Sequence, residues 1–217
     1  MKKEYPQLIL LIGPSACGKS LFSRYFRGCF PQYEKEDDRS LVEKYLKETG
    51  LLAIEDPCVW DNIIIQLAKN LKQDKKYIVE FARGHDSNYL SKFNLEPKDV
   101  YPRTIDLILS SMHPGFTESV GIIHIDCRYE ARTVRNSERR KSTGQDLPDS
   151  VLNKVFKDDV FMPEYIDEKG PALRRGKFIK SIPVVTIDNS QTIEDGGLSE
   201  HFTSLATKTM NLLISGF

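Results

Sequence analysis

The sequence has little of what marks a membrane, secreted or metal-cluster protein. No apolar run approaches the roughly 20 residues that cross a membrane, and no signal-peptide core follows the start Met1-Lys2-Lys3-Glu4. The cysteines show no paired metal-ligand spacing; they are Cys17, Cys29, Cys58 and Cys127. We therefore expect no membrane partner, reduced thiols and a cytoplasmic location.

An excess of charge of either sign is also missing. The 217 residues carry 31 Lys and Arg against 31 Asp and Glu, so overall charge does not favour a nucleic-acid or membrane-surface partner. Internal repeats and low-complexity tracts are absent. The length suits a single domain with an inserted lid rather than two independent cores.

What the sequence does contain is a phosphate-binding motif. Residues 13–20 match G-x-x-x-x-G-K-[ST], the Walker A pattern, directly after the aliphatic run Leu8–Ile12. Backbone N–H groups of such a loop surround phosphates, and the dipole of the following helix favours an anion. Lys19 is expected to reach the β- and γ-phosphates and Ser20 to ligate Mg²⁺. The residues predicted to bind the nucleotide are Gly13, Pro14, Ser15, Ala16, Cys17, Gly18, Lys19 and Ser20.

Short apolar segments alternate with helical patterns along the chain. The predicted strands are Leu8–Ile12, Tyr77–Phe81, Gly121–Asp126 and Ile182–Asp188, with a weaker fifth near Gln32–Glu34. The predicted helices are Leu21–Phe26, Ser40–Glu48, Cys58–Leu71, Thr104–Met112, Glu130–Arg140, Ser150–Asp159 and Leu198–Ile214. This alternation predicts a three-layer α/β/α sandwich with a mostly parallel five-stranded sheet. Between Phe161 and Lys180 we expect a loop or the border of a lid.

A carboxylate and an arginine lie at the end of the second strong strand. Glu80 is costly to bury unless it is paired or holds a cation, so it is a candidate for holding Mg²⁺ or accepting a proton. Arg83 is a candidate clamp for a phosphate or carboxylate of the acceptor. The alternative is an internal ion pair between the two side chains.

Four arginines recur at helical spacing after the third strong strand: Arg128, Arg132, Arg135 and Arg139. Spacings of four, three and four place them on one face of a helix. Because like charges repel there, the stripe favours an anion lying across it. A solvated helix relieved by Glu130 and Glu138 is the alternative.

The segment Asp126–Arg140 resembles the strand-to-lid segment of the adenylate-kinase-like (nucleoside monophosphate kinase) superfamily of P-loop kinases. The resemblance implies that Arg135 packs against the adenine ring and that Arg139 contacts the transferring phosphate, in a lid spanning about 128–176. Glu80-Phe81-Ala82-Arg83 is similar to that family's acidic residue and arginine after its third strand. The P-loop fold, ATP and Mg²⁺ are implied with it.

Two departures from that family's pattern leave the superfamily supported but do not support a nucleoside monophosphate as the acceptor. The acidic residue is Glu80 rather than the usual Asp, and no clear monophosphate-recognition sequence lies between residues 30 and 75. Residues 146–152 instead look like lid sequences of P-loop kinases that phosphorylate small metabolites or polynucleotide 5′-hydroxyls. A further arginine pair, Arg174-Arg175, is either a phosphate contact from the lid or simply exposed.

We predict the acceptor side of the site in residues 34–39, which follow the first predicted helix. Asp38 is a candidate general base and Arg39 a candidate clamp for the acceptor. Alternatively, Asp38 caps the helix Ser40–Glu48. The catalytic candidates are thus Lys19, Asp38, Glu80, Arg83 and Arg139, and the metal candidates are Ser20 and Glu80.

Together these features predict an ATP- and Mg²⁺-dependent kinase that transfers the γ-phosphoryl group to a small-molecule acceptor. A regulatory P-loop NTPase without group transfer and a polynucleotide 5′-hydroxyl kinase are the alternatives. The sequence specifies neither the acceptor nor the oligomeric state.

Overall fold

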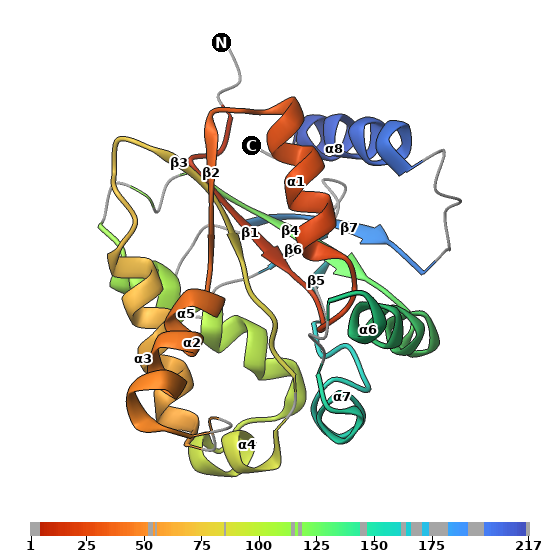
Figure 1. Cartoon of the computed structure of the whole chain (residues 1–217). Helices are drawn as coiled ribbons and strands as arrows, with labels where there is room; N and C mark the ends of the chain where they lie inside the picture. The colour runs from red at the N-terminus through yellow and green to blue at the C-terminus, as the bar shows by residue number, and fades with distance from the viewer. Residues whose placement is uncertain are drawn as a thin grey trace.

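The computed structural model describes residues 5–51, 54, 56–84, 86–113, 116, 119–143, 147–161, 164–165, 171–173, 182–190 and 198–215. Its centre is a sheet in the order β2-β3-β1-β4-β7-β6-β5 (Figure 1). The first five are parallel: β2 Tyr33–Asp37, β3 Lys76–Glu80, β1 Leu8–Ile12, β4 Val120–Asp126 and β7 Ile182–Asp188. This confirms the predicted five-stranded parallel sheet. Two short antiparallel strands extend it, β6 Pro171–Leu173 and β5 Glu164–Tyr165.

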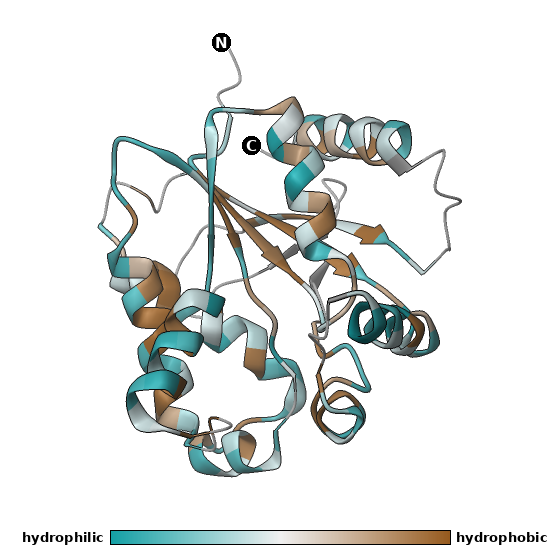
Figure 2. Cartoon of the chain, in the orientation of Figure 1, coloured by the Kyte–Doolittle hydropathy of each residue, from teal (hydrophilic) through white to brown (hydrophobic). Residues whose placement is uncertain are grey.

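The strand β1 is buried along its whole length because both faces of the sheet are covered. Its alternating side chains enter two separate cores: Leu8, Leu10 and Ile12 pack on one face, Ile9 and Leu11 on the other. Hydrophobic residues accordingly gather on the central strands in Figure 2.

Helices form the two outer layers. On one face, α1 Lys19–Cys29 and α8 Leu198–Ser215 lie side by side (Figure 1) and bury aromatic and aliphatic side chains against the sheet. On the other face, α3 Pro57–Lys69 and α5 Val100–Ser111 pack together and contribute to the second core. The predicted three-layer α/β/α sandwich is therefore confirmed.

The remaining helices lie around the carboxyl ends of the strands. They are α2 Arg39–Thr49, α4 Ser87–Phe93, α6 Tyr129–Thr143 and α7 Asp149–Val155, with a 3₁₀ turn at Pro97–Asp99. The described residues include no helix long and apolar enough to cross a membrane.

Predicted and observed elements differ mainly where the sequence signal is short. The strands β1 and β7 have the predicted bounds, whereas β2 runs further than expected, to Asp37. The helix α4 and the 3₁₀ turn had no prediction, and β5 and β6 lie in a segment expected to be loop. Arg174-Arg175 lies outside the described residues.

Candidate active site

The phosphate-binding loop joins β1 to α1 at the carboxyl edge of the sheet. Gly13 has a φ of 145°, and a Cβ there would lie 2.4 Å from the Ile125 carbonyl oxygen. Gly18 has a φ of 98°, and its Cβ would lie 2.4 Å from Asn189 Nδ2. Both positions therefore require glycine. No side chain caps the N-terminus of α1, which suits a helix end that meets an anion.

Lys19 is buried and bends back over this loop. Its Nζ donates to the carbonyl oxygens of Gly13, at 2.9 Å, and Pro14, at 2.8 Å. A phosphate oxygen entering the loop would exchange with these carbonyls as the partner of the ammonium group. Burial raises the pKa of the neighbouring Cys17 thiol, so we expect an unreactive thiol there.

The carboxylate of Glu80 lies beside the first turn of α1. Ser20 Oγ donates to Glu80 Oε1 at 2.5 Å, and Lys35 Nζ lies 3.1 Å from Glu80 Oε2. Lys35 also pairs with Asp37 at 2.8 Å. A hydroxyl and carboxylate oxygens are the donor types that Mg²⁺ prefers, so Ser20 and Glu80 fit the predicted metal. Among the described residues no three acidic, His or Cys side chains form a metal-binding cluster.

A second carboxylate–cation pair lies next to the first. Arg83 Nη1 is 3.3 Å from Asp38 Oδ2, and the side chain of Arg83 is only 9% exposed. The predicted alternative of a Glu80–Arg83 ion pair is therefore wrong: each side chain has a different partner. Asp38 occupies the N-cap position of α2 but makes no side-chain capping bond, so its carboxylate is directed to Arg83.

The Asp38–Arg83 pair has unused hydrogen-bonding capacity. Arg83 Nη2 is buried without a hydrogen-bond partner, and the guanidinium lies 5.2 Å from the ring centroid of Trp60. Burial raises the pKa of the Asp38 carboxyl, while the Arg83 and Lys19 cations lower it. A buried unpaired donor in a native fold calls for a partner, and a bound ligand would supply one.

The arginines of α6 divide into different environments. Arg135 Nη1 lies 3.1 Å from Cys127 Sγ and 3.4 Å from the Cys17 carbonyl oxygen, so this side chain rests on the phosphate-binding loop. Arg139 is exposed one turn further along. Arg132, in contrast, is fully buried and donates to the carbonyl oxygens of Cys127, Phe156 and Lys157.

The expectation that an anion lies across all four arginines is therefore wrong at Arg132. Its guanidinium joins α6 to the end of α7 and is satisfied by backbone carbonyls, so it needs no anion. Sequence spacing placed the residue on the correct face of the helix but did not show that another segment covers that face.

The segment after α7 is anchored in the core. His124 Nε2 lies 2.7 Å from Asp159 Oδ2, and the His124 ring packs against Phe161 with centroids 4.7 Å apart. Phe161 also contacts Tyr101 edge-on at 5.5 Å, and the Tyr101 hydroxyl accepts a hydrogen bond from the Arg83 backbone N–H at 3.2 Å. The segment after α7 is thus connected through Tyr101 to Arg83.

Two residues at the site were missed by the sequence prediction. Asn189 follows β7, is buried, and donates to the Cys17 carbonyl oxygen at 2.8 Å. Its position at a strand's carboxyl end was the available signal. Lys35 lies in a strand whose end was predicted too early, so its pairing with Glu80 was not foreseen.

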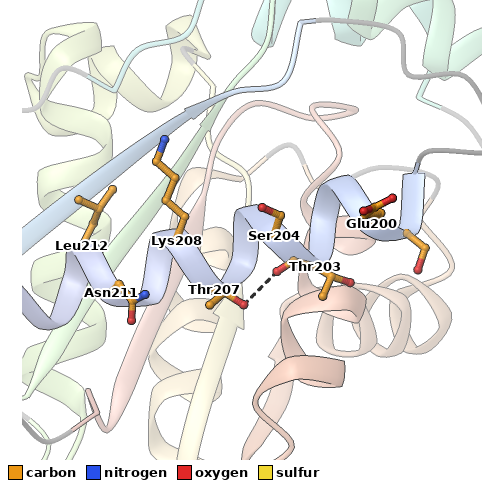
Figure 3. Close-up of a pocket in the computed structure, with 8 residues that line it drawn as sticks. Glu200, Thr203, Ser204, Thr207, Lys208, Asn211 and Leu212 are labelled. Atoms are coloured by element: carbon orange, nitrogen blue, oxygen red, sulfur yellow. Dashed lines mark hydrogen bonds between the residues drawn. The ribbon is translucent and has the colours of Figure 1, made fainter.

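A separate hollow of about 860 Å³ runs along α8 (Figure 3). All its lining residues come from that one helix, where Thr207 Oγ1 donates to the Thr203 carbonyl oxygen at 3.1 Å. None of the residues discussed above lines it, and we assign it no role.

Neither a protein-family model nor a curated protein matches the sequence. Solved structures do match the fold. A sugar kinase from Janibacter sp. is 13% identical, with 97% of this chain and 98% of that chain covered and a TM-score of 0.57. The fold is that of the P-loop kinases.

Two further structures share this arrangement. A gluconokinase from Sinorhizobium meliloti is 14% identical, with 97% of this chain and 95% of that chain covered and a TM-score of 0.57. Kti12 from Chaetomium thermophilum, solved with ADP-AlF3, is 11% identical, with 94% and 98% covered and a TM-score of 0.51. At such identities the likeness concerns the P-loop kinase fold, and residue roles must be argued from the site.

Proposed function

We propose that this chain is an ATP- and Mg²⁺-dependent phosphotransferase that transfers the γ-phosphoryl group to a small-molecule acceptor. The observation that carries the proposal is the grouping of three features at one sheet edge. They are the glycine-dependent loop at 13–20, the Ser20–Glu80 contact, and the partly buried Asp38–Arg83 pair with the buried, unpaired donor Arg83 Nη2. A P-loop kinase needs a triphosphate site, a metal site and an acceptor site, and these three features correspond to them.

On the nucleotide side, the loop amides and Lys19 bind the phosphates. Arg135 already contacts the loop through the Cys17 carbonyl oxygen, which supports its proposed place beside the nucleotide. Arg139, one turn further along α6, is proposed to stabilise charge on the transferring group. Most of the rate enhancement then comes from positioning and charge stabilisation. Residues 128–176 are the proposed lid region, in which α6 and α7 would exclude water while Asp159 and Phe161 stay anchored in the core.

On the acceptor side, Asp38 is the proposed general base and Arg83 the clamp. Asp38 takes the proton of an acceptor hydroxyl as its oxygen attacks the γ-phosphorus, and the bond from that phosphorus to ADP breaks. The raised pKa of Asp38 makes its carboxylate a better base than an exposed aspartate. Arg83 Nη2, buried without a partner, would donate to a polar group of the acceptor.

Mg²⁺ is proposed at Ser20, with Glu80 orienting the hydroxyl or binding a metal-bound water. A divalent cation there would supply neutralising charge to the phosphates. The 2.5 Å contact from Ser20 Oγ to Glu80 directs the hydroxyl proton to the carboxylate and leaves the oxygen lone pairs for the metal.

The experiment is to offer γ-labelled ATP and Mg²⁺ with a panel of acceptors: sugars, sugar acids, nucleosides, nucleoside monophosphates and 5′-hydroxyl oligonucleotides. Sugars and sugar acids are included because two structures with this fold are named as a sugar kinase and a gluconokinase. We expect label on a small molecule in the wild type and none in Lys19→Ala.

Three results would contradict the proposal. Brisk hydrolysis without label on any acceptor, altered by a protein partner, would indicate a regulatory NTPase instead. Label on oligonucleotides alone, with binding that weakens as salt rises, would indicate a polynucleotide 5′-hydroxyl kinase. Unchanged labelling in Lys19→Ala would mean that the loop is not the site.

A further inference from the structure

Lys35 lies between two carboxylates at the carboxyl edge of the sheet. Because side chains alternate along β2, Lys35 and Asp37 project from the same face of the strand. The register of β2 with β3 sets Asp37 beside Glu80. The Lys35 ammonium lies 2.8 Å from Asp37 and 3.1 Å from Glu80, so one cation serves both acids.

The two oxygens of Glu80 have different partners. Oε1 accepts the Ser20 hydroxyl, while Oε2 faces Lys35 at 3.1 Å and Ser23 Oγ at 3.5 Å. The lysine therefore holds the carboxylate in the orientation that directs the other oxygen to Ser20. Removing the ammonium would leave Oε2 with only the longer Ser23 contact and would leave two like charges side by side.

Lys35 differs from Lys75, which lies just before β3 and forms a surface ion pair with Glu34 of β2. Lys75 pairs with Glu34 at 2.6 Å, but both side chains are well exposed, at 38% and 48%. Lys35 and Glu80 are only 25% and 11% exposed. Water screens the first pair far more than the second.

We propose that Lys35 is a positioning residue that acts as the resident cation of the Asp37–Glu80 pair. It holds Glu80 on Ser20 and keeps the two carboxylates from binding a divalent cation before the nucleotide arrives. Divalent metal then enters with the triphosphate, which brings its own ligands. The inference rests on the proposed magnesium site at Ser20 and Glu80.

The test is Mn²⁺ binding to nucleotide-free protein, followed by electron paramagnetic resonance, in wild type, Lys35→Met, Lys35→Gln and Lys75→Met. We expect both Lys35 variants to bind Mn²⁺ about tenfold more tightly, because a positive charge is removed close to the metal. Lys75→Met should match the wild type. A further variant, Lys35→Arg, should bind Mn²⁺ as weakly as the wild type, because arginine keeps the positive charge.

Adding Glu80→Gln to Lys35→Met should abolish the gain, which assigns it to this carboxylate. Unchanged Mn²⁺ affinity in both Lys35 variants would overturn the inference, as would an equal gain in Lys75→Met. A lower melting temperature in the Lys35 variants without a change in metal affinity would mean a purely structural ion pair.

The measurement needs no turnover, so the two proposals can fail separately. If the Lys35 variants gain Mn²⁺ affinity but no acceptor is labelled, the proposed phosphotransferase activity is overturned and the proposed role of Lys35 is supported. Labelled acceptor with unchanged Mn²⁺ affinity would do the reverse.

Discussion

At the scale of single residues, Ala16 carries an unusual backbone conformation. It lies in the phosphate-binding loop with a φ of 62°, in the left-handed region that L-residues other than Asn and Asp rarely adopt. The loop therefore has positive φ at a residue with a Cβ, in addition to Gly13 and Gly18.

Ala16→Gly should stabilise the protein by about 1 kcal/mol, because glycine adopts this conformation without steric cost. Denaturant unfolding would measure the change. Ala131→Gly in α6 is the matched control and should have the opposite sign, since glycine disfavours helix interiors. Destabilisation by both changes would show that Ala16 is not strained.

The second residue-scale prediction concerns Asp38 and pH. Burial raises the pKa of this carboxyl and Arg83 lowers it. Because a base must be ionised, kcat/KM should fall as pH decreases through the raised pKa of the free enzyme. Arg83→Gln removes the lowering cation, so the acid limb of the pH–rate profile should move to higher pH.

Asp38→Asn provides the control for that assignment. It should lower kcat by at least about 100-fold and remove the acid limb from the residual activity. Persistence of the same limb in Asp38→Asn would assign the titration to another group.

At the scale of elements, the joint between α6 and α7 depends on one side chain. Arg132 supplies donors to three backbone carbonyls, at Cys127, Phe156 and Lys157. Arg140, on the same helix, instead forms an exposed pair with Asp149 at 3.0 Å. The two arginines thus offer a buried and an exposed site for the same substitution.

Arg132→Met should lower the free energy of unfolding by about 3 kcal/mol, because three hydrogen bonds of a buried guanidinium to backbone carbonyls are lost. For a chain of this size that corresponds to roughly 10 °C in Tm, measured by calorimetry. Arg140→Met should cost about 1 kcal/mol or less. Equal losses in the two variants would contradict the structural role of Arg132.

At the scale of the whole molecule, the loop at 13–20 contacts segments distant in sequence, through Ile125, Arg135 and Asn189. A ligand in the loop should therefore stabilise the fold as a unit. At 100 times Kd, ATP with Mg²⁺ should add about 2.7 kcal/mol, which is roughly 5–10 °C in Tm.

Thermal unfolding with and without nucleotide would check this. Lys19→Ala should abolish the shift, whereas Lys208→Ala, in the hollow along α8, should keep it. A retained shift in Lys19→Ala together with a lost shift in Lys208→Ala would place the nucleotide in the hollow.

Local pattern was enough to predict much of this fold. The strand β1 is a continuous aliphatic run, β7 is rich in Val and Ile, and the loop glycines belong to a fixed motif. The seven-residue α4 is too short for a clear helical period, which is why it had no prediction.

Pairings across the sheet could not be predicted in the same way. That Glu80 and Arg83 lie at a strand end was visible in the sequence. Their partners, Lys35 and Asp38, depend on β2 lying beside β3, which is a matter of strand order. The burial of Arg132 likewise depends on the residues that follow α7, Phe156 and Lys157, lying against α6.

The cation–π contact of Trp60 gives the molecule a built-in optical reporter. It is the single tryptophan of the chain, and its indole lies 5.2 Å from the Arg83 guanidinium. Any change in tryptophan emission therefore comes from Trp60, which contacts Arg83 of the proposed acceptor site. An acceptor that draws Arg83 toward itself should alter that emission, so candidate substrates can be ranked by fluorescence titration without labels or turnover.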